Sequence, residues 1–275
     1  MIPKVIHYCW FGGKPLTPEI LLFIESWKKH LPDYELKEWN ESNFDVNSSV
    51  WTKEAYSCHK FAFVSDYVRL KILYEYGGIY MDTDVEVLRS FDDLLDLPYF
   101  VGRENTIHGI NTATIGVEPH CPWIKICMQH YDNRHFLHGD VMDMRVNPEL
   151  IKDDLLKNGF KFNELNSKED FIEGPKIFNI FPAVYFSPLK SGKDTSTNNT
   201  YAVHRYMSTW NKMSFLQCLV MHVKNFLKMV LPKKFSQRIL AYKKRKRDSF
   251  FEKNYAKISR IAKNELFMSF SPQQR

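Results

Sequence analysis

A helix that turns directly into a short buried strand is the feature of this sequence that most constrains its fold. Apolar residues recur every four positions between 64 and 72, which predicts a helix over about residues 60–76. Gly77-Gly78 supply the stop for this helix, because glycine tolerates the backbone angles that end one. The apolar run 79–81 then predicts a buried strand. This order of elements is typical of an α/β protein.

The rest of the first 210 residues repeats the alternation of strands and helices. Thr17 and Pro18 are a cap and a first-turn residue for another helix, which we expect to reach about His30. Together these patterns predict an α/β fold with a mainly parallel sheet and helices on both sides. The further expected elements are strands at 4–10, 34–39, 85–88, 99–102 and 112–117, helices at 122–131 and 148–158, an extended segment at 176–186 and a surface loop at 190–200.

Charge divides the chain into two parts. The formal net charge is +6, but residues 1–210 carry −7 and residues 211–275 carry +13. Residues 211–275 combine an apolar stripe at helical spacing with the polybasic run 243–247, a pattern that favours an amphipathic element on an anionic membrane surface. Nucleic-acid binding is not expected, because the tail lacks clear aromatic interleaving. The predicted division is a domain at 1–210 and a basic helical extension at 211–275.

Cysteine use and hydropathy bear on the compartment. The five cysteines are widely spaced and form no CxxC pair, so neither a disulfide scaffold nor a cysteine zinc site is expected. No signal peptide and no uninterrupted apolar run long enough to span a bilayer are apparent in the sequence. A cytoplasmic protein that is peripheral on the inner face of the membrane is the prediction.

Two acidic side chains follow the buried strand. In an extended segment residues i and i+2 point to the same side, so Asp82 and Asp84 are expected to project together from the end of the strand. Open α/β sheets place ligands at that edge. Neighbouring carboxylates repel unless a cation lies between them, and Mg²⁺ and Mn²⁺ prefer oxygen ligands and recruit diphosphates. Acidic pairs are also common in turns, so the pair alone has low specificity.

Two further groups flank this pair. Asp66 and Arg69 lie three apart on one face of the preceding helix, where they either form a surface ion pair or face the same pocket and bind sugar hydroxyls. Trp10 ends the first strand and is followed by Gly12-Gly13. It could stack on a nucleobase while the glycines let the backbone approach, although a core tryptophan above a turn explains the pattern equally simply.

Three segments together resemble glycosyltransferase family 32, which contains DXD sugar-transferases such as capsule and lipopolysaccharide enzymes and fungal mannosyltransferases. The chain is also remotely similar to the catalytic domain of large glucosylating toxins. The resemblance spans roughly residues 1–120 and resumes near 176–210, and the basic tail lies outside it. The segments that carry it are IPKVIHYCWFGG at 2–13, FAFVSDYVRLKILYEYGGIYMDTDVEVL at 61–88 and HRYMSTW at 204–210.

The resemblance implies a GT-A fold, a Rossmann-like nucleotide-binding sheet, and transfer with retention of configuration from a nucleotide-diphosphate sugar. It implies that Mn²⁺ or Mg²⁺ is bound by Asp84 directly and by Asp82 through water, and that His204 is a further ligand of the metal or of the phosphate. Asp82 would otherwise contact the ribose of the donor. Many relatives have a second histidine where this chain has Arg205, so the last metal ligand is the least secure of these roles, and Arg205 could itself contact phosphate.

The resemblance also assigns donor contacts. Asp66 and Arg69 would hold the donor sugar and, with Asp82 and Asp84, form the catalytic set. The other donor-binding residues it implies are Trp10, Gly12, Gly13, Asn111, Ser208 and Trp210.

The predicted function is a metal-dependent hexosyltransferase that acts on a glycan or lipid-linked oligosaccharide acceptor in surface polysaccharide synthesis. The alternative is a non-catalytic nucleotide- or metal-binding protein that its basic tail targets to membrane or RNA. Acceptor residues are expected within 130–190, where the sequence shows no readable motif.

Overall fold

The computed structural model describes residues 1–207, apart from 106–108, 140 and 191–192. The predicted basic extension at 211–275, and with it Ser208 and Trp210, lies outside the described residues. Short 3-10 turns occur at Asp92–Leu94, Lys168–Asp170 and Ala183–Tyr185. The helices are α1 (Pro18–His30), α2 (Val50–Ser57), α3 (Phe61–Tyr76), α4 (Pro122–Gln129) and α5 (Asn147–Lys157).

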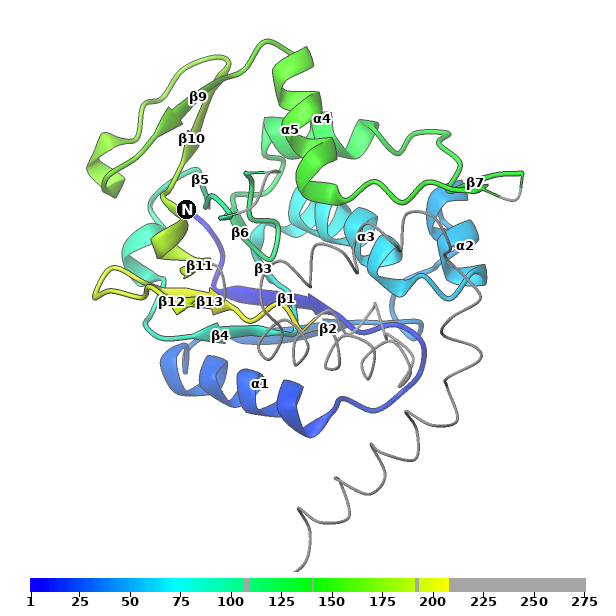
Figure 1. Ribbon diagram of the computed structural model, residues 1–275, viewed down its shortest axis with the longest axis horizontal. Helices are drawn as coiled ribbons and strands as arrows, with labels where there is room; N and C mark the ends of the chain where they lie inside the picture. The colour runs from blue at the N-terminus through cyan, green and yellow to red at the C-terminus, as the bar shows by residue number, and fades with distance from the viewer. Residues whose placement is uncertain (106–108, 140, 191–192, 208–275) are drawn as a thin grey trace, which may run out of the picture. The chain divides into compact units, whose positions relative to one another are not determined.

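A five-stranded sheet in the order β2-β1-β3-β6-β5 forms the centre of this part of the chain (Figure 1). Its strands are β1 (Val5–Cys9), β2 (Glu35–Trp39), β3 (Gly78–Met81), β5 (Tyr99–Val101) and β6 (Thr114–Val117). The remaining strands pair two by two and are β4 (Val85–Val87), β7 (Leu137–His138), β8 (Val141–Met142), β9 (Lys161–Glu164), β10 (Ile177–Ile180), β11 (Leu189–Lys190), β12 (Lys193–Asp194) and β13 (Ala202–His204).

The expected α/β fold is confirmed, but the expectation of a mainly parallel sheet is wrong. β1 runs parallel to β2 and to β3, whereas β3 pairs antiparallel with β6, and β6 antiparallel with β5. β6 is inserted between β3 and β5, and because both of these strands are antiparallel to β6, they run parallel to each other. The half β2-β1-β3 is therefore parallel and Rossmann-like, and the half β3-β6-β5 is antiparallel because of the inserted strand β6.

Helices cover both faces of the sheet, as predicted (Figure 1). One hydrophobic core joins the sheet to α2, α3, α4 and α5, and a second joins its other face to α1 and β4. Trp27 on α1 is fully buried in the second core, and its indole N–H donates to the carbonyl of Val85 at 2.7 Å. This bond attaches α1 to the strand that follows the paired carboxylates.

Glycine at position 78 lets β3 approach β1. Its φ is +91°, and a Cβ atom there would lie 2.8 Å from the carbonyl oxygen of Val5. Both facts exclude a larger residue without a backbone shift. The Gly77-Gly78 pair thus ends α3 and starts β3 within two residues, which fixes where the acidic turn after β3 emerges.

The buried His7 stabilises the same junction in its neutral form. Its Nδ1 accepts from the Trp39 indole at 3.1 Å, and its Nε2 donates to the carbonyl of Gly77 at 3.0 Å. Burial lowers the pKa of His7 to about 4, although the bond to Gly77 opposes this shift. Because the unfolded chain binds this proton near pH 6.5, the stability is present above pH 6.5 and declines as the pH falls towards 4.

We expect His7 to account for about 2 kcal/mol of the free energy of unfolding that is lost between pH 7 and pH 5. Urea unfolding at both pH values measures this loss. In His7→Gln, which keeps a donor for the Gly77 carbonyl but does not titrate, the loss should shrink by that amount. An equal loss in the wild type and the variant would contradict a neutral, buried His7.

Candidate active site

The two acidic residues lie in a tight turn between β3 and β4. The backbone N–H of Asp82 donates to the carbonyl of Ala113 on the β6 side at 2.9 Å, and the N–H of Val85 donates to the carbonyl of Asp82 at 3.1 Å. The expectation that Asp82 and Asp84 project from an extended segment is therefore wrong. The turn, rather than the alternation of a strand, determines where the two carboxylates point.

Pairing of β13 with β4 brings a distant histidine to this turn. His204 lies opposite Val85 in an antiparallel register, which places its Nε2 3.4 Å from Asp84 Oδ1. The other oxygen of Asp84 accepts from the N–H of Met207 at 2.8 Å. One ligand atom from each of Asp82, Asp84 and His204 lies within 4.8 Å of the others. The three residues that the sequence singled out as metal ligands thus lie together.

The electrostatics of this group match a cation site. Burial raises the pKa of Asp84, but the hydrogen bond and charge of His204 outweigh it and hold that pKa below its usual value. Burial lowers the pKa of His204, and Asp84 reverses this shift so that the net change is upward. The buried Nδ1 of His204 has no hydrogen-bond partner in the described part of the chain. Two carboxylates and an imidazole fit Mn²⁺ or Mg²⁺ and do not distinguish them.

Arg69 connects helix α3 to the acidic turn. One of its terminal nitrogens lies 3.1 Å from Asp66 Oδ1 and 3.3 Å from Asp82 Oδ1, while the other donates to the carbonyl of Thr112 at 2.7 Å. The guanidinium lies 4.6 Å from the ring centre of Tyr80, whose hydroxyl donates to Asp82 Oδ1 at 2.8 Å. Asp82 is thus fixed by two donors on one oxygen. Arg69 pairs with both Asp66 and Asp82. The two carboxylates, rather than the guanidinium, are therefore the groups available to a ligand.

Asp66 is the buried carboxylate of the Asp66–Arg69 pair, and its pKa is strongly shifted. Burial raises its pKa to about 6, and the opposing charge of Arg69 offsets this only in part. The surface ion pair considered from the sequence is therefore excluded, because Arg69 is only 4% exposed and Asp66 only 9%. Sequence reasoning placed both residues on the side of the acidic turn, and the structure brings them there.

The aromatic and glycine residues after β1 are held by packing. Trp10 is half-buried and donates its indole N–H to the carbonyl of Lys14 at 2.5 Å. A Cβ atom at Gly12 would lie 2.4 Å from the ring of Phe61, so glycine is required there for close packing of the protein itself. Gly13 has φ +64° and open space where a side chain would be, so its predicted contact with the donor stays a prediction.

Asn111 is close to the site but is not exposed to it. Its side chain is fully buried, donates to the carbonyl of Phe186 at 3.3 Å and accepts from the N–H of Ala113 at 2.8 Å. Ala113 in turn accepts the backbone bond from Asp82. This burial indicates that Asn111 supports the acidic turn, rather than making the direct donor contact that was expected of it.

Arg205 also differs from expectation. A phosphate contact was considered for it, but its guanidinium pairs with Glu86 and lies 3.5 Å from Asp194. Its backbone N–H donates to the carbonyl of Asp84 at 2.9 Å. Two acids therefore neutralise the side chain, and its backbone helps to close the acidic turn.

Glu104 is a site residue that sequence reasoning missed. It follows β5, and its Oε1 lies 3.9 Å from the Nδ1 of His204 with the carboxylate side chain only 8% exposed. At this distance the two groups form no hydrogen bond, but the carboxylate charge attracts the Nδ1 side of the imidazole and leaves Nε2 on the side of Asp84. No local pattern marks this residue, because only the pairing of β13 with β4 places His204 beside it.

We expect Glu104→Gln to weaken Mn²⁺ binding about tenfold, because loss of the carboxylate beside a metal-binding histidine usually costs roughly 10–100-fold in affinity. Isothermal titration with Mn²⁺ measures this change. Glu104→Asp should retain part of the affinity, and Glu118→Gln, which removes an acid elsewhere on the surface, should leave it unchanged. Unaltered Mn²⁺ affinity in Glu104→Gln would exclude the orienting role.

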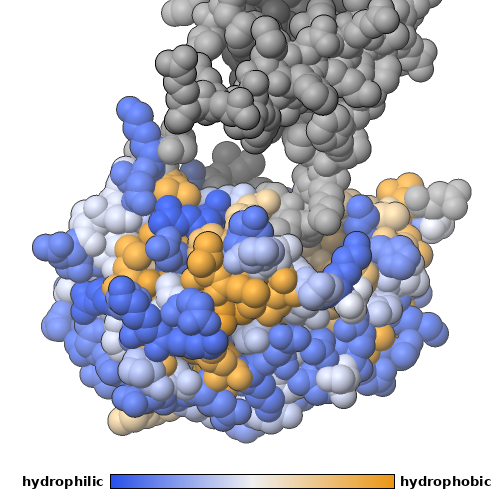
Figure 2. All heavy atoms as spheres, turned by 90° about the horizontal axis from the view of Figure 1, so that it is seen from below, coloured by the Kyte–Doolittle hydropathy of each residue, from blue (hydrophilic) through white to orange (hydrophobic). Residues whose placement is uncertain are grey.

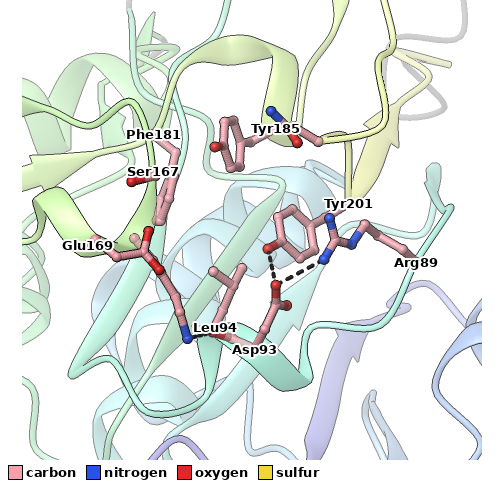
Figure 3. Close-up of a pocket in the computed structure, with 10 residues that line it drawn as sticks. Arg89, Asp93, Leu94, Ser167, Glu169, Phe181, Tyr185 and Tyr201 are labelled. Atoms are coloured by element: carbon pink, nitrogen blue, oxygen red, sulfur yellow. Dashed lines mark hydrogen bonds and ion pairs between the residues drawn. The ribbon is translucent and has the colours of Figure 1, made fainter.

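A separate cavity of about 160 Å³ lies at the opposite end of the β4–β13 pair (Figure 3). There Asp93 accepts from the hydroxyl of Tyr201 at 2.7 Å and from Arg89 at 2.9 Å, and Arg89 also packs over the Tyr201 ring. These bonds fix the residue immediately before β13, the strand that carries His204. We interpret this cluster as structural support for the site.

Comparison with known proteins agrees with this geometry. Residues 18–101 match the family described as a glycosyltransferase sugar-binding region containing a DXD motif. This segment includes Asp66, Arg69, Asp82 and Asp84. Residues 18–101 are therefore similar to a DXD-type glycosyltransferase sugar-binding region, and the resemblance to DXD sugar-transferases drawn from the sequence is confirmed.

Among curated proteins, the chain is similar to inositol phosphoceramide mannosyltransferases 2 and 3 of Schizosaccharomyces pombe. The first is 29% identical over 143 residues, 48% of this chain and 39% of that protein. The second is 31% identical over 150 residues, 51% of this chain and 41% of that protein. The matches thus span less than half the length of these relatives.

Solved structures give weaker likenesses. PaToxG glycosyltransferase has a TM-score of 0.44 and 21% identity, over 57% of this chain and 70% of that chain. The galactosyltransferase LgtC has a TM-score of 0.37 and 14% identity, over 73% of this chain and 86% of that chain.

Proposed function

We propose that this protein is a metal-dependent glycosyltransferase that moves a hexose from a nucleotide-diphosphate sugar to an acceptor hydroxyl. The observation that carries the proposal is the convergence of Asp82, Asp84 and His204 beside the buried Asp66–Arg69 pair. Ligands for a divalent cation and a carboxylate suited to sugar hydroxyls thus lie at one sheet edge. In an α/β sheet this edge is where ligands bind.

Asp82, Asp84 and His204 would hold the cation, which when bound neutralises the charge that develops on the departing diphosphate. Asp66, fixed by Arg69, would accept hydrogen bonds from donor hydroxyls and orient the anomeric carbon. The acceptor oxygen forms a new bond to the anomeric carbon while the bond between that carbon and the diphosphate oxygen breaks. The acceptor proton passes to the leaving phosphate oxygen, which gives retention by front-face attack.

The proposal also specifies the class of donor sugar and the class of acceptor. The fission-yeast relatives are named as mannosyltransferases that act on a phosphoceramide, which supports a hexose donor such as mannose and a lipid-linked acceptor. A role in surface polysaccharide synthesis, in capsule or lipopolysaccharide, is retained as part of the proposal on the sequence resemblance alone.

A lipid-linked acceptor also requires access to a membrane surface, and we propose a peripheral location on the cytoplasmic side. In the described part of the chain, no helix is both long and apolar enough to cross a bilayer. Apolar side chains gather on the face seen in Figure 2, the side on which α1 lies. Leu21 and Leu22 on α1 are 47% and 70% exposed. These side chains support the proposal, which otherwise depends on the basic residues 211–275.

The function is tested with a panel of nucleotide-diphosphate sugars, first by thermal shift with Mn²⁺ and then by release of the nucleoside diphosphate. A true donor should raise the melting temperature by mass action, and its hydrolysis should require Mn²⁺. Stabilisation without any turnover would favour the alternative, a non-catalytic nucleotide-binding protein. If no donor shifts the melting temperature, both functions are excluded for this panel.

A further inference from the structure

A second cavity, of about 240 Å³, differs in chemistry from the acidic turn. It is formed by the loop after β5 together with α5 and β9, and its described lining is Arg103, Gly109, Ile110, Lys152, Leu156 and Phe162. This volume is below the roughly 300–1,000 Å³ of pockets that hold drug-sized ligands. It suits a small headgroup better than an oligosaccharide.

Both ionisable residues of this described lining are basic. Arg103 pairs with the exposed Glu164, and none of the ion pairs found in the described chain involves Lys152. The Nε of Arg103 is buried and has no hydrogen-bond partner among the described residues. Two cations with unused donors favour an anion with several oxygens, and phosphate matches the planar guanidinium especially well.

Apolar side chains share the cavity with these cations. Leu156 on α5 is 51% exposed although it is a large apolar residue, and Phe162 on β9 is half-buried. A free inorganic anion gains nothing from such neighbours, because they offer no hydrogen bonds. An anion attached to an apolar group gains about 25 cal/mol for each Å² of apolar surface it buries.

The cavity is next to the candidate active site along the same loop. Arg103 precedes Glu104, the residue beside His204. On the other side of the loop, Gly109 accepts from the N–H of Glu104 at 3.4 Å, and the N–H of Asn111 donates to Gly102 at 2.7 Å. The two halves of the loop are thus held together, so one ordered loop carries both Arg103 of the cavity and Glu104 of the candidate active site.

On the basis of the proposed function, we propose that this cavity binds the phosphate of a lipid acceptor. Arg103 and Lys152 contact the phosphate, and Leu156 and Phe162 contact the adjoining apolar part. The headgroup hydroxyl that receives the sugar then faces the metal-binding residues. The site explains how an acidic body selects an anionic acceptor.

The test uses three probes on the full chain, each measured by isothermal titration at 0.3 M salt, which roughly limits surface attraction to short range. Dihexanoyl phosphatidic acid has the phosphate and the tails, dihexanoylglycerol has only the tails, and inorganic phosphate has only the anion. We expect the phosphatidic acid to bind at least tenfold more tightly than either of the other two. Equal affinity for inorganic phosphate would indicate a free-phosphate site, and equal affinity for dihexanoylglycerol a merely apolar one, and either result would overturn the proposal.

Variants separate this cavity from the basic tail. Arg103→Gln and Lys152→Gln should each weaken phosphatidic acid binding about tenfold, while Lys157→Gln, on the same helix but outside the lining, should change it less than twofold. Glu164→Gln, which releases Arg103 from its acid, should strengthen binding severalfold. If Arg103→Gln and Lys152→Gln bind like the wild type, the proposal is wrong.

Two further measurements keep the proposal distinct from the proposed function. Thermal unfolding checks that each variant is folded, and Mn²⁺-dependent donor hydrolysis should be unchanged in both cavity variants. If the wild type does not hydrolyse any donor, the proposed function is contradicted. The titrations with phosphatidic acid would still test lipid binding independently.

Discussion

Asp84→Asn should lower donor turnover by about 10³-fold and abolish measurable Mn²⁺ binding, with little effect on folding. Asp84 supplies the carboxylate oxygen that lies 3.4 Å from His204 at the centre of the candidate metal site. An asparagine is the same size and can still accept from the N–H of Met207, so the turn should persist. What it lacks is the negative charge that holds a divalent cation against an imidazole.

A matched control is available on the adjacent strand. Glu86 on β4 is a half-buried carboxylate that pairs with Arg205, and it is not one of the grouped metal-binding residues. Glu86→Gln should keep turnover within about threefold and Mn²⁺ affinity unchanged. If Asp84→Asn and Glu86→Gln change turnover and Mn²⁺ affinity equally, or if Asp84→Asn has normal turnover, Asp84 is not a metal ligand.

Arg69→Met should destabilise the folded protein by about 3–5 kcal/mol and also abolish turnover, because breaking a buried ion pair leaves an uncompensated charge. Arg69 is only 4% exposed, and its guanidinium faces Asp66, Asp82 and the carbonyl of Thr112. Methionine keeps much of the volume but none of the donors. Urea unfolding measures the stability, and nucleoside diphosphate release measures the turnover.

The double variant Asp66→Asn/Arg69→Met separates the two effects. Neutralising Asp66 removes the buried charge that Arg69 compensates, so stability should recover by more than about 1 kcal/mol relative to Arg69→Met alone. Turnover should not recover, because Asp82 still lacks its guanidinium and Asp66 its carboxylate. Strictly additive losses of stability would contradict direct coupling between Asp66 and Arg69.

Much of the fold could be predicted because the apolar periodicity of the helices agrees with the capping and terminating residues at their ends. Thr17 does accept the cap hydrogen bond of α1, and α3 ends at Gly77 as expected. Strand direction could not be predicted, because it depends on the insertion of β6 between β3 and β5, which is a long-range pairing. Helix α2 was missed because Trp51 and Ala55 are its only buried apolar residues, and two such positions in eight are too few for a period to be recognised.

Two segments after residue 175 were interpreted incorrectly. The extended character expected over 176–186 is present only in β10, because Pro182 is followed by a 3-10 turn. Residues 190–200, expected to be a loop, include the short β11–β12 pair. The first departure is a 3-10 turn of three residues and the second is a pairing of two residues on each strand, and segments this short leave no periodic trace in the sequence.

The site was predictable where chemistry is local and unpredictable where it depends on long-range pairing. Asp82 and Asp84 follow one strand, so their proximity can be inferred, although the turn that orients them cannot. Asp66 and Arg69 share a helical face, but their burial depends on β6 and Thr112 packing over them. Position 204 was reached only through the family resemblance, and Glu104 not at all, because residues about 100 positions apart meet through β13.

The most direct test of the central claim is the location of Mn²⁺ in a crystal soaked with Mn²⁺ and a nucleoside diphosphate, read from anomalous scattering. The account predicts one peak bonded to Asp84 and His204, with Asp82 bonded to it directly or through water and a diphosphate oxygen beside it. A diphosphate bound at this edge with no Mn²⁺ at Asp84, or Mn²⁺ bound only elsewhere, would contradict it.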